Sequence, residues 1–359
     1  MLMTTAPKKV LLLSRYDSLG ASSRVRYLQY ISQLEAQGWT VEVSALFSND
    51  YIEALYDGSG RFRHAVQGYL KRLVVLFKAW RFDILILEKE LLPFLPAWLE
   101  RVLANLNIPY VVDYDDALFH RYDLNPHLLV RTVLGRKIDA VMHNAAVVIA
   151  GNEYLAERAY MAGARRIEII PTVVDTQRYQ PSELDVDSTP VIGWIGTPKT
   201  SRYLKMLLPT FEKLQKELQV RFFAVGARNG DFSKSLIEVI PWSEDTEIAS
   251  IRSFSIGIMP LTDSPWERGK CGYKLIQCMA CAKPVVASPV GVNSEIVEPG
   301  INGYLAGTPE DWYHYLYKLL VSPNLRYQMG LKGRQKVVNW YSKQAQAPRL
   351  FNVLESLAK

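Results

Sequence analysis

The stretch that decides the fold is residues 265–298, PWERGKCGYKLIQCMACAKPVVASPVGVNSEIVE. It opens with a loop that holds Arg268, Lys270 and Gly272, continues through an apolar helical segment, and turns at Pro284 into an apolar strand. This order places backbone N–H groups and the positive end of a helix dipole beside basic side chains, as in sites that hold a phosphate or diphosphate. The same residues also allow a basic, solvated loop that enters an ordinary helix.

Length and composition predict a globular protein with two domains. The chain has 359 residues, of which 49% are hydrophobic and 22% charged. The net charge of +6 is moderate. It does not indicate a nucleic-acid partner, whereas an anionic ligand or membrane surface would suit it.

Cysteine usage and hydropathy favour a cytoplasmic location. The three cysteines all lie within one short segment and cannot form a paired framework, which is typical of a reducing compartment. Cys278 and Cys281 form a lone CxxC, which we interpret as small helix residues rather than a zinc or redox site. Lys8 and Lys9 precede a short apolar run that predicts a strand rather than a signal peptide. No stretch approaches the ~18 apolar residues of a membrane-spanning helix.

The first half of the chain alternates short apolar runs with helical patterns, which predicts an α/β fold with a doubly wound parallel sheet. The expected strands are at 9–14, 40–46, 83–87, 109–113, 145–150 and 167–170. The turn after the first strand contains Gly20 and Ala21 but lacks the GxGxxG pattern, so a nicotinamide cofactor is not indicated.

The second half predicts another sheet of the same kind, with strands at 191–195, 220–225, 255–259 and 284–288. We expect an N-terminal domain at 1–180, a linker at 181–189, a C-terminal domain at 190–340, and a helix at 341–359 that packs back toward the first domain. Ligands of such sheets bind at the carboxyl ends of strands, so a cleft between the domains is the expected site.

Residues 58–82 contain no acidic residue and predict a basic amphipathic helix. The basic residues are Arg61, Arg63, Lys71, Arg72, Lys78 and Arg81, and the apolar stripe consists of Val66, Leu70, Leu73, Phe77 and Trp80. Such a stripe serves either of two purposes. It can pack on the sheet, which we favour because the segment leads into a strand, or it can lie on an anionic membrane surface.

The strand at 109–113 ends in a cluster of carboxylates, Asp113, Asp115 and Asp116, with His120 close behind. A divalent metal is one interpretation, but no other carboxylate cluster follows a comparable strand. We therefore favour a role in positioning or activating a hydroxyl group. For Asp116, capping of the next helix remains an alternative.

Together these residues resemble glycosyltransferase family 4. The family signature, Glu-x-Phe-Gly-x-x-x-x-Glu-Ala-Met-Ala-x-Gly-x-Pro-Val-Val-Ala, overlays residues 269–287. The matching positions are Gly272, Met279, Ala280, Pro284, Val285, Val286 and Ala287, with further matches at Gly291, Glu295, Ile296, Val297, Gly300, Gly303 and the stretch 170–175. The resemblance implies a GT-B fold of two facing Rossmann-like domains, a nucleotide-sugar donor, retention of anomeric configuration, and no cofactor or metal.

The chain departs from the signature at both glutamates. The first falls on Gly269, and the second, which in the family binds the donor's ribose, falls on Gln277. An amide still hydrogen-bonds a diol, but less strongly than a carboxylate does. The family's phosphate-binding Arg and Lys fall on Thr197 and Arg202, and its histidine near the reacting sugar falls on Asp115.

The resemblance and the residues together give a set of expected roles. Donor binding is assigned to Gly196, Lys199, Arg202, Gly272, Tyr273, Lys274 and Gln277; catalysis to Asp115, His120 and Lys270; and acceptor binding to Gly20, Ala21, Arg24 and Arg26. Cations and amides would stabilise the charge that grows on the departing nucleoside diphosphate, a task for which no metal is expected.

The predicted function is that of a retaining glycosyltransferase of the hexosyltransferase type. We expect a glycan or polyprenyl-linked acceptor in bacterial surface polysaccharide synthesis, at the inner face of the membrane. Two alternatives stand beside it. One is a nucleotide-sugar epimerase, which shares the GT-B architecture, and the other is a non-catalytic glycan- or nucleotide-binding protein, since both signature glutamates are replaced.

Overall fold

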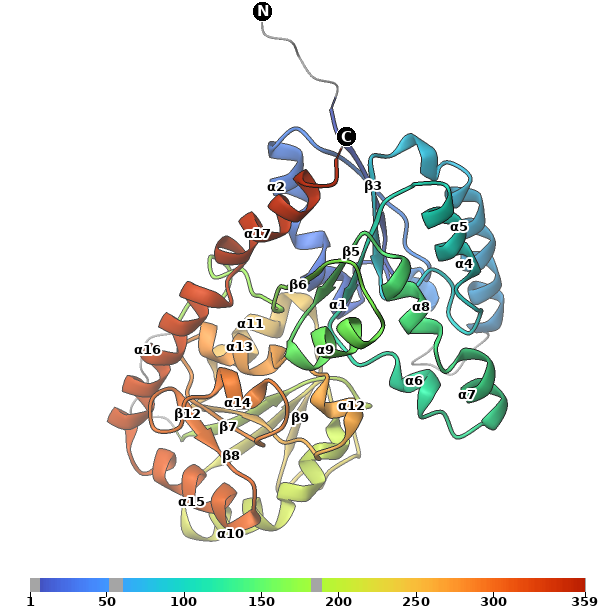
Figure 1. Cartoon of the computed structure of the whole chain (residues 1–359). Coiled ribbons are helices and arrows are strands. Elements are labelled where there is room, and N and C mark those ends of the chain that lie inside the picture. The colour runs from blue at the N-terminus through green and yellow to red at the C-terminus, as the bar shows by residue number, and fades with distance from the viewer. Residues whose placement is uncertain (1–6, 52–60, 182–188, 359) are drawn as a thin grey trace, which may run out of the picture. The chain divides into compact units, whose positions relative to one another are not determined.

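The computed structural model describes residues 7–51, 61–181 and 189–358, and the chain divides into two compact units (Figure 1). The first unit comprises residues 1–172 and 346–359, and the second comprises residues 173–345. Most of the expected linker at 181–189 lies outside the described residues. Both units are α/β, each built on one parallel sheet of six strands.

The sheet of the first unit has the order β2-β1-β3-β4-β5-β6, and every pair is parallel. The strands are β1 (Lys9–Leu13), β2 (Thr40–Val43), β3 (Ile84–Glu88), β4 (Tyr110–Tyr114), β5 (Val147–Ala150) and β6 (Ile167–Ile169). The central strands β3, β4 and β5 are buried along their whole length, because helices cover both faces of a doubly wound sheet. All six strands were expected from their apolar runs.

Helices α4, α5 and α8 lie on one face of this sheet, and α2 and the end of α17 on the other (Figure 1). The helical elements are α1 (Ala21–Arg26), η1 (Leu28–Tyr30), α2 (Ile31–Ala36), α4 (Arg61–Leu76), η2 (Ala79–Arg81), α5 (Trp98–Asn105), α6 (His120–Asp123), α7 (Leu128–Leu134), α8 (Lys137–Asn144) and α9 (Glu153–Met161). The helical segment after Gly20 is divided into α1, η1 and α2, because buried Tyr27 leaves the helical conformation at φ −136°.

Helix α4 packs on the sheet through a face other than its apolar stripe. A Cβ at Gly68 would lie 2.1 Å from the carbonyl oxygen of Leu46, so the helix approaches the backbone closely there. Arg72 is buried, and its guanidinium donates to the carbonyl oxygens of Ser14 (2.6 Å) and Ser44 (3.0 Å). The stripe from Val66 to Trp80 is exposed instead, so the packing role that we favoured for it is wrong.

The sheet of the second unit has the order β12-β11-β10-β7-β8-β9, again all parallel. The strands are β7 (Val191–Ile195), β8 (Arg221–Val225), β9 (Glu238–Ile240), β10 (Ile256–Met259), β11 (Val285–Ala287) and β12 (Gly303–Leu305). The edge strands β9 and β12 were not predicted, since three residues are too few to give a periodic signal.

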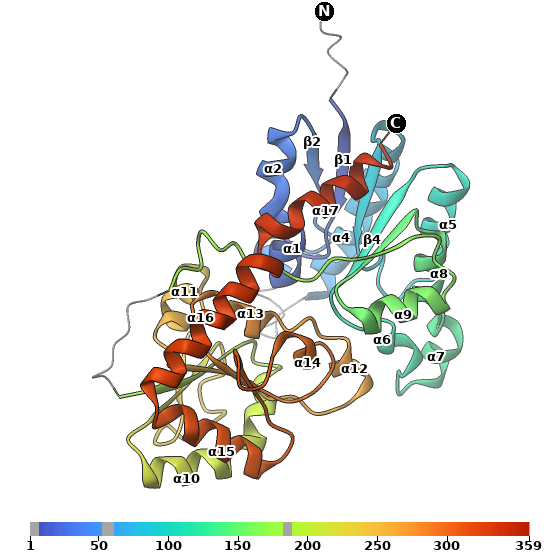
Figure 2. The ribbon, with the colours of Figure 1, turned by 60° about the vertical axis from the view of Figure 1, so that its left-hand side comes forward.

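The helical elements of the second unit are η3 (Ser201–Leu207), α10 (Leu208–Glu217), α11 (Glu244–Arg252), α12 (Pro265–Arg268), α13 (Tyr273–Ala280), α14 (Asn293–Ile296), α15 (Pro309–Leu320), α16 (Pro323–Trp340) and α17 (Lys343–Glu355). Helices α10 to α16 are labelled in Figure 2, and η3 precedes them in the chain. Beyond residue 345, α17 belongs to the first unit, where Phe351 contacts the ring of Tyr30 and Glu355 accepts a hydrogen bond from the indole N–H of Trp39 (3.1 Å).

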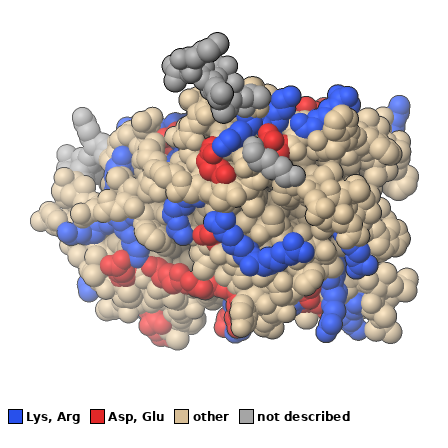
Figure 3. Space-filling view, turned by 45° about the horizontal axis from the view of Figure 1, so that its top comes forward, with Lys and Arg blue, Asp and Glu red and all other residues tan. Residues whose placement is uncertain are grey.

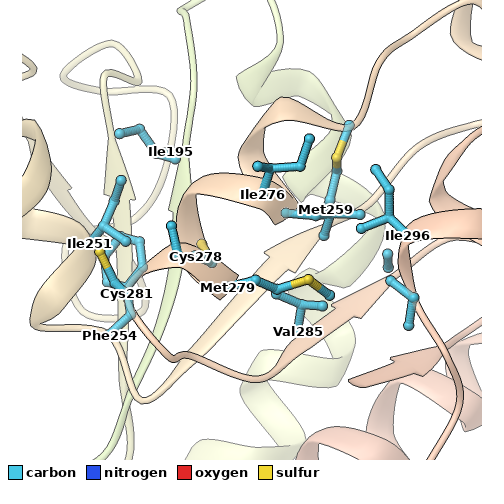
Figure 4. Packing of buried hydrophobic residues seen from close by; sticks show 14 of the residues in the cluster. Ile195, Ile251, Phe254, Met259, Ile276, Cys278, Met279, Cys281, Val285 and Ile296 are labelled. Atoms are coloured by element: carbon cyan, nitrogen blue, oxygen red, sulfur yellow. The ribbon is translucent and has the colours of Figure 1, made fainter. Parts of the chain in front are cut away.

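Helix α13 is held by the core of the second unit, where Ile276, Cys278 and Met279 pack with Met259 and Val285 (Figure 4). All three cysteines of the chain are buried. Burial raises the pKa of the Cys281 thiol to about 11, so it is a protonated packing group at neutral pH. The CxxC pair thus serves as small core residues, as interpreted from the sequence.

Charged side chains of both signs lie on the surface of the folded chain. Lys and Arg side chains are dispersed among uncharged residues on the face that Figure 3 shows. Within 7–51, 61–181 and 189–358, no helix is both long and apolar enough to cross a membrane.

Candidate functional site

The turn that leads into α13 requires a glycine. Gly272 has φ 65°, in the left-handed region, and a Cβ there would lie 2.3 Å from Cδ1 of Ile296. Its carbonyl oxygen accepts from the backbone N–H groups of Leu275 (2.9 Å) and Ile276 (3.3 Å), which starts the helix. The positive end of the α13 dipole therefore lies beside Tyr273 and Lys274, as the sequence predicts.

The loop after β7 meets α13 at Gly196 and Lys274. The backbone N–H of Gly196 donates to the carbonyl oxygen of Val225 (3.0 Å), which fixes the loop to the neighbouring strand. A Cβ at Gly196 would lie 2.5 Å from the ring of Trp194 and 2.9 Å from Cε of Lys274. The ammonium of Lys274 stands 5.5 Å from the centroid of the Trp194 ring. Glycine at 196 thus leaves the space that the Lys274 side chain occupies.

Glu267, a buried carboxylate on α12, connects α12 to η3. It accepts hydrogen bonds from the hydroxyls of Tyr203 and Ser264, and the guanidinium of Arg202 lies 3.5 Å from it. Burial raises the pKa of Glu267, but these hydrogen bonds and the charge of Lys270 outweigh it, so the net shift is downward. Glu267 is therefore ionised at neutral pH and holds Arg202 and Lys270 on one side of the unit.

Two of the predicted cations of the second unit interact with one carboxylate, and a third lies at Gly196. Arg202 and Lys270 both interact electrostatically with Glu267. The side chain of Lys274 lies against Gly196, which is in the loop that leads to Arg202. Lys199 is exposed in that loop. The sequence analysis missed Glu267, although a glutamate two residues before Gly269 was a visible signal.

Gln277 is buried within a polar cluster rather than open to solvent. Its side-chain N–H donates to the hydroxyl of Tyr179 and to Oε1 of Glu247, both at 3.0 Å. Glu247 also accepts from the hydroxyl of Tyr179 and, at 2.7 Å, from the indole N–H of Trp242. The chain lacks a carboxylate at position 277, but the side chain there contacts the carboxylate of Glu247 on α11, 30 residues away in sequence. This separation explains why spacing alone missed the contact.

In the first unit, Asp115 lies in an ion pair at the end of β4. Its carboxylate is 2.7 Å from the ammonium of Lys89 and accepts from the hydroxyl of Ser22 (2.5 Å). Burial raises its pKa, but Lys89 and Ser22 outweigh this and hold the pKa of Asp115 at about 2. Asp116 is 3.5 Å from Lys89, and α6 begins only at His120, so Asp116 does not cap that helix.

The pairing of Asp115 predicts a pH-dependent contribution to stability. The folded pKa of about 2 lies below the ordinary value of about 3.9, so the contribution is full above pH ~4 and is lost as the pH falls toward 2. We expect Asp115→Asn to lower Tm at pH 7 and the difference from wild type to narrow below pH ~4. Calorimetric melts at several pH values check this, and a difference that stays constant down to pH ~3 would contradict the ion pair.

Arg26 has a structural role in place of the predicted acceptor contact. It is buried, and its Nε and Nη2 donate to the two oxygens of Asp113 at 2.8 and 2.6 Å. Its Nη1 donates to the carbonyl oxygen of Ile170 (3.0 Å) and to Thr172 (3.3 Å). The bidentate ion pair leaves this guanidinium no capacity for an anionic acceptor, so the assignment of Arg26 is corrected.

The other residues predicted near the first glycine turn have different surroundings. Arg24 donates to the carbonyl oxygen of Ser18 (2.9 Å), and Ala21 is exposed at the start of α1. Gly20 is buried, and a Cβ there would lie 2.4 Å from Cβ of Tyr16. Glycine at position 20 therefore lets the backbone of the turn pass close to Tyr16.

His120 lies in a hydrogen-bonded network with both ring nitrogens engaged. Nδ1 is 2.9 Å from Asp123, and Nε2 is 2.8 Å from the hydroxyl of Tyr154. Arg158 pairs with Asp123 (3.0 Å) and Asp139 (2.7 Å), which closes the network. His120 is the first residue of α6 and contacts α9 through Tyr154. Its catalytic role stays a prediction.

The sequence analysis did not identify a second buried network at the end of β3. Glu90 accepts from Lys137 (2.5 Å), Arg15 (3.2 Å) and Tyr122 (2.7 Å). Glu88 accepts from the backbone N–H of Arg15 and from the Ser23 hydroxyl, both at 2.7 Å. Three consecutive charged residues directly after a buried strand were the signal. Within the described parts of the chain, no group of His, Cys, Asp and Glu has the arrangement of a metal site.

Comparison with known proteins relates the second unit to a known family. Residues 189–322 match the family model of glycosyl transferases group 1. An uncharacterized glycosyltransferase of Methanocaldococcus jannaschii is 32% identical over 111 residues, which is 30% of this chain and 30% of that relative. These matches support a glycosyltransferase, and the family match covers most of the second unit.

The fold is shared with solved glycosyltransferase structures along nearly the whole chain. Sucrose-phosphate synthase of Thermosynechococcus elongatus gives a TM-score of 0.72 at 17% identity, with 98% of this chain and 99% of that chain covered. Anabaena HepE in complex with UDP-glucose gives 0.70 at 16%, covering 97% and 99%. The lipopolysaccharide outer core galactosyltransferase WaaB gives 0.62 at 13%, covering 97% and 99%. The chain therefore has the two-domain GT-B fold.

Proposed function

We propose that this protein is a glycosyltransferase that takes its sugar from a nucleoside diphosphate donor bound by the second unit. The observation that carries the proposal has two parts: Arg202 and Lys270 interact with Glu267, and Lys274 lies against Gly196 at the start of α13, all within the segment that matches group 1 glycosyl transferases. The crystallised complex of HepE with UDP-glucose supports a nucleotide-sugar as donor.

The chemistry assigned to these residues is stabilisation of the leaving group. When the bond between sugar and diphosphate breaks, negative charge grows on the diphosphate. Arg202 and Lys270, which interact with Glu267, and Lys274 at the start of α13 supply positive charge to this region, together with the positive end of the α13 dipole. Because Glu267 fixes Arg202 before the donor arrives, little reorganisation is needed during the reaction.

Glu247 is proposed to restore the missing ribose-binding carboxylate. Gln277 occupies the signature position, and its amide is bonded to Glu247 at 3.0 Å. A carboxylate accepts hydrogen bonds from a diol more strongly than an amide does, and Gln277 fixes the orientation of this one. In this account the two residues together take the place of the family's single glutamate.

The finer features of the reaction are proposals of the same kind. We assign the protein a retaining, metal-independent hexosyl transfer to a glycan or polyprenyl-linked acceptor in surface polysaccharide synthesis. The likeness to the lipopolysaccharide outer core galactosyltransferase WaaB supports this class of acceptor. The ionised Asp115 in the first unit is the carboxylate proposed to orient the acceptor or the reacting sugar.

A panel of nucleotide-sugars tests the donor assignment. We expect one of them to raise the melting temperature and to be consumed with release of the nucleoside diphosphate. At a donor concentration of about 100 times Kd the stabilisation is about 2.7 kcal/mol. A panel that leaves Tm unchanged would contradict the proposal. An isomerised sugar formed from the donor alone would identify an epimerase, and binding without hydrolysis or transfer would identify a binding protein.

A further inference from the structure

Helix α4 and η2 present two parallel stripes of side chains to solvent. Large apolar side chains recur at i+4 and i+3 steps along one stripe, and basic residues occupy four of the six positions one residue later. The apolar stripe consists of Phe62, Val66, Leu70, Leu73, Phe77 and Trp80, and the basic stripe consists of Arg63, Lys71, Lys78 and Arg81. We call these ten residues the basic apolar face.

The burial pattern shows that this face is not part of the core. Phe62 is 79% exposed, Phe77 81% and Trp80 70%. The opposite side of the helix supplies the packing, through Gly68 at the Leu46 carbonyl and through the buried Arg72. The orientation of α4 is thus fixed by its inward contacts, and these hold the aromatic side chains outward.

The charge on this face has one sign. Residues 58–82 contain no acidic residue, so no carboxylate of the same segment neutralises the basic stripe. The guanidinium of Arg81 lies 5.2 Å from the centroid of the Trp80 ring, which places a cation directly at the end of the apolar stripe. A surface that is apolar along its middle and cationic along its edge is complementary to an anionic bilayer.

A neighbouring loop also presents an exposed aromatic side chain beside a basic one. The hydroxyl of Tyr69, on α4, donates to the carbonyl oxygen of Pro93 (2.5 Å), which ties the loop before α5 to this helix. The next residue, Phe94, is 46% exposed, and the guanidinium of Arg121 lies 4.8 Å from its ring centroid. A second exposed aromatic side chain with an adjacent cation therefore adjoins α4.

We infer that the basic apolar face docks this protein on an anionic phospholipid surface, with the aromatic and aliphatic side chains entering the interface and the basic stripe facing the headgroups. The occupant is a bilayer because the face combines large apolar side chains with positive charge that no carboxylate within residues 58–82 neutralises, which suits an interfacial amphipathic helix. This inference stands on the first unit alone and does not depend on glycosyl transfer.

Flotation of the full-length protein with phosphatidylcholine vesicles, with and without phosphatidylglycerol, tests the inference. We expect binding to the anionic vesicles to be at least about tenfold tighter than to neutral ones and to weaken with added salt. The variants Lys71→Glu/Lys78→Glu and Phe77→Ser/Trp80→Ser should each lose at least about tenfold in binding, because they remove the charge and the apolar insertion separately.

Matched controls separate the face from general effects. Lys216→Glu/Lys332→Glu changes the net charge by the same amount on exposed helix positions of the second unit, and Tyr160→Ser removes an aromatic side chain that is 77% exposed on α9. Both should bind vesicles as wild type does. Melting temperatures and donor binding, measured in parallel, verify that each variant is folded.

Three outcomes would overturn the inference. Wild-type protein that stays unbound, or control and face variants that bind equally well, would exclude a bilayer at this face. A dimer in analytical ultracentrifugation that Phe77→Ser/Trp80→Ser converts to a monomer would assign the face to a second copy of the chain. Because no donor or acceptor is present, failure here would leave the donor assignment intact.

Discussion

Lys270→Ala is expected to lower kcat/KM for sugar transfer by about 100-fold or more, since removal of one preorganised donor to a developing charge typically costs that much. Lys270 interacts electrostatically with Glu267, which also pairs with Arg202, and it lies in the segment that leads into α13. The loss corresponds to about 2.7 kcal/mol of transition-state stabilisation. Initial rates of nucleoside diphosphate release, measured with saturating acceptor, check this value.

Two variants bracket the effect of Lys270→Ala. Lys216→Ala removes an exposed lysine from α10 and should leave the rate unchanged. Lys270→Arg keeps the charge and should recover part of the activity. Activity of Lys270→Ala within about threefold of wild type would remove this residue from the diphosphate site, because even a tenfold loss corresponds to only about 1.4 kcal/mol.

Arg26→Met is expected to destabilise the protein by about 3–5 kcal/mol, because it leaves a buried carboxylate without its partner. Asp113 is buried, and burial raises its pKa despite the bidentate contact with Arg26. Without the guanidinium the carboxyl group must be protonated in the folded chain or remain charged in a low-dielectric site. Urea unfolding followed by tryptophan fluorescence measures the loss.

The double variant Arg26→Met/Asp113→Leu separates the ion pair from other effects. Replacing both charges with apolar side chains removes the unpaired carboxylate, so it should recover a large part of the lost stability. Single-variant stability equal to wild type, accompanied by a raised KM for the acceptor, would instead restore the acceptor role that the sequence analysis assigned to Arg26.

Elements with a strong local pattern could be predicted from the sequence. The apolar runs of β1, β3 and β4 and the Gly272 turn before α13 depend on neighbours a few residues away, so spacing and composition define them. The edge strands β9 and β12 were missed because each has three residues and depends on pairing with β8 or β11. The resemblance to glycosyltransferases supplied the GT-B fold, which local pattern alone did not.

Side-chain partners that are distant in sequence could not be predicted. Arg26 and Asp113 are 87 residues apart, and Gln277 meets Glu247 across 30 residues. A residue chosen for its charge, such as Arg26, can therefore be neutralised in the core by a partner that no spacing reveals. The packing role predicted for the apolar stripe of α4 was wrong for a related reason. The periodicity of the stripe is the same whether it faces the sheet or the solvent.

The most direct test of the central claim compares two ligands by calorimetry, the nucleoside diphosphate that the donor panel selects and the corresponding nucleoside. If Arg202, Lys270 and Lys274 hold the diphosphate, wild type should bind the diphosphate at least about 100-fold more tightly than the nucleoside, a difference of about 2.7 kcal/mol. In Arg202→Ala/Lys270→Ala this preference should fall to within about tenfold, while nucleoside affinity stays constant. An undiminished preference in the double variant would contradict the account.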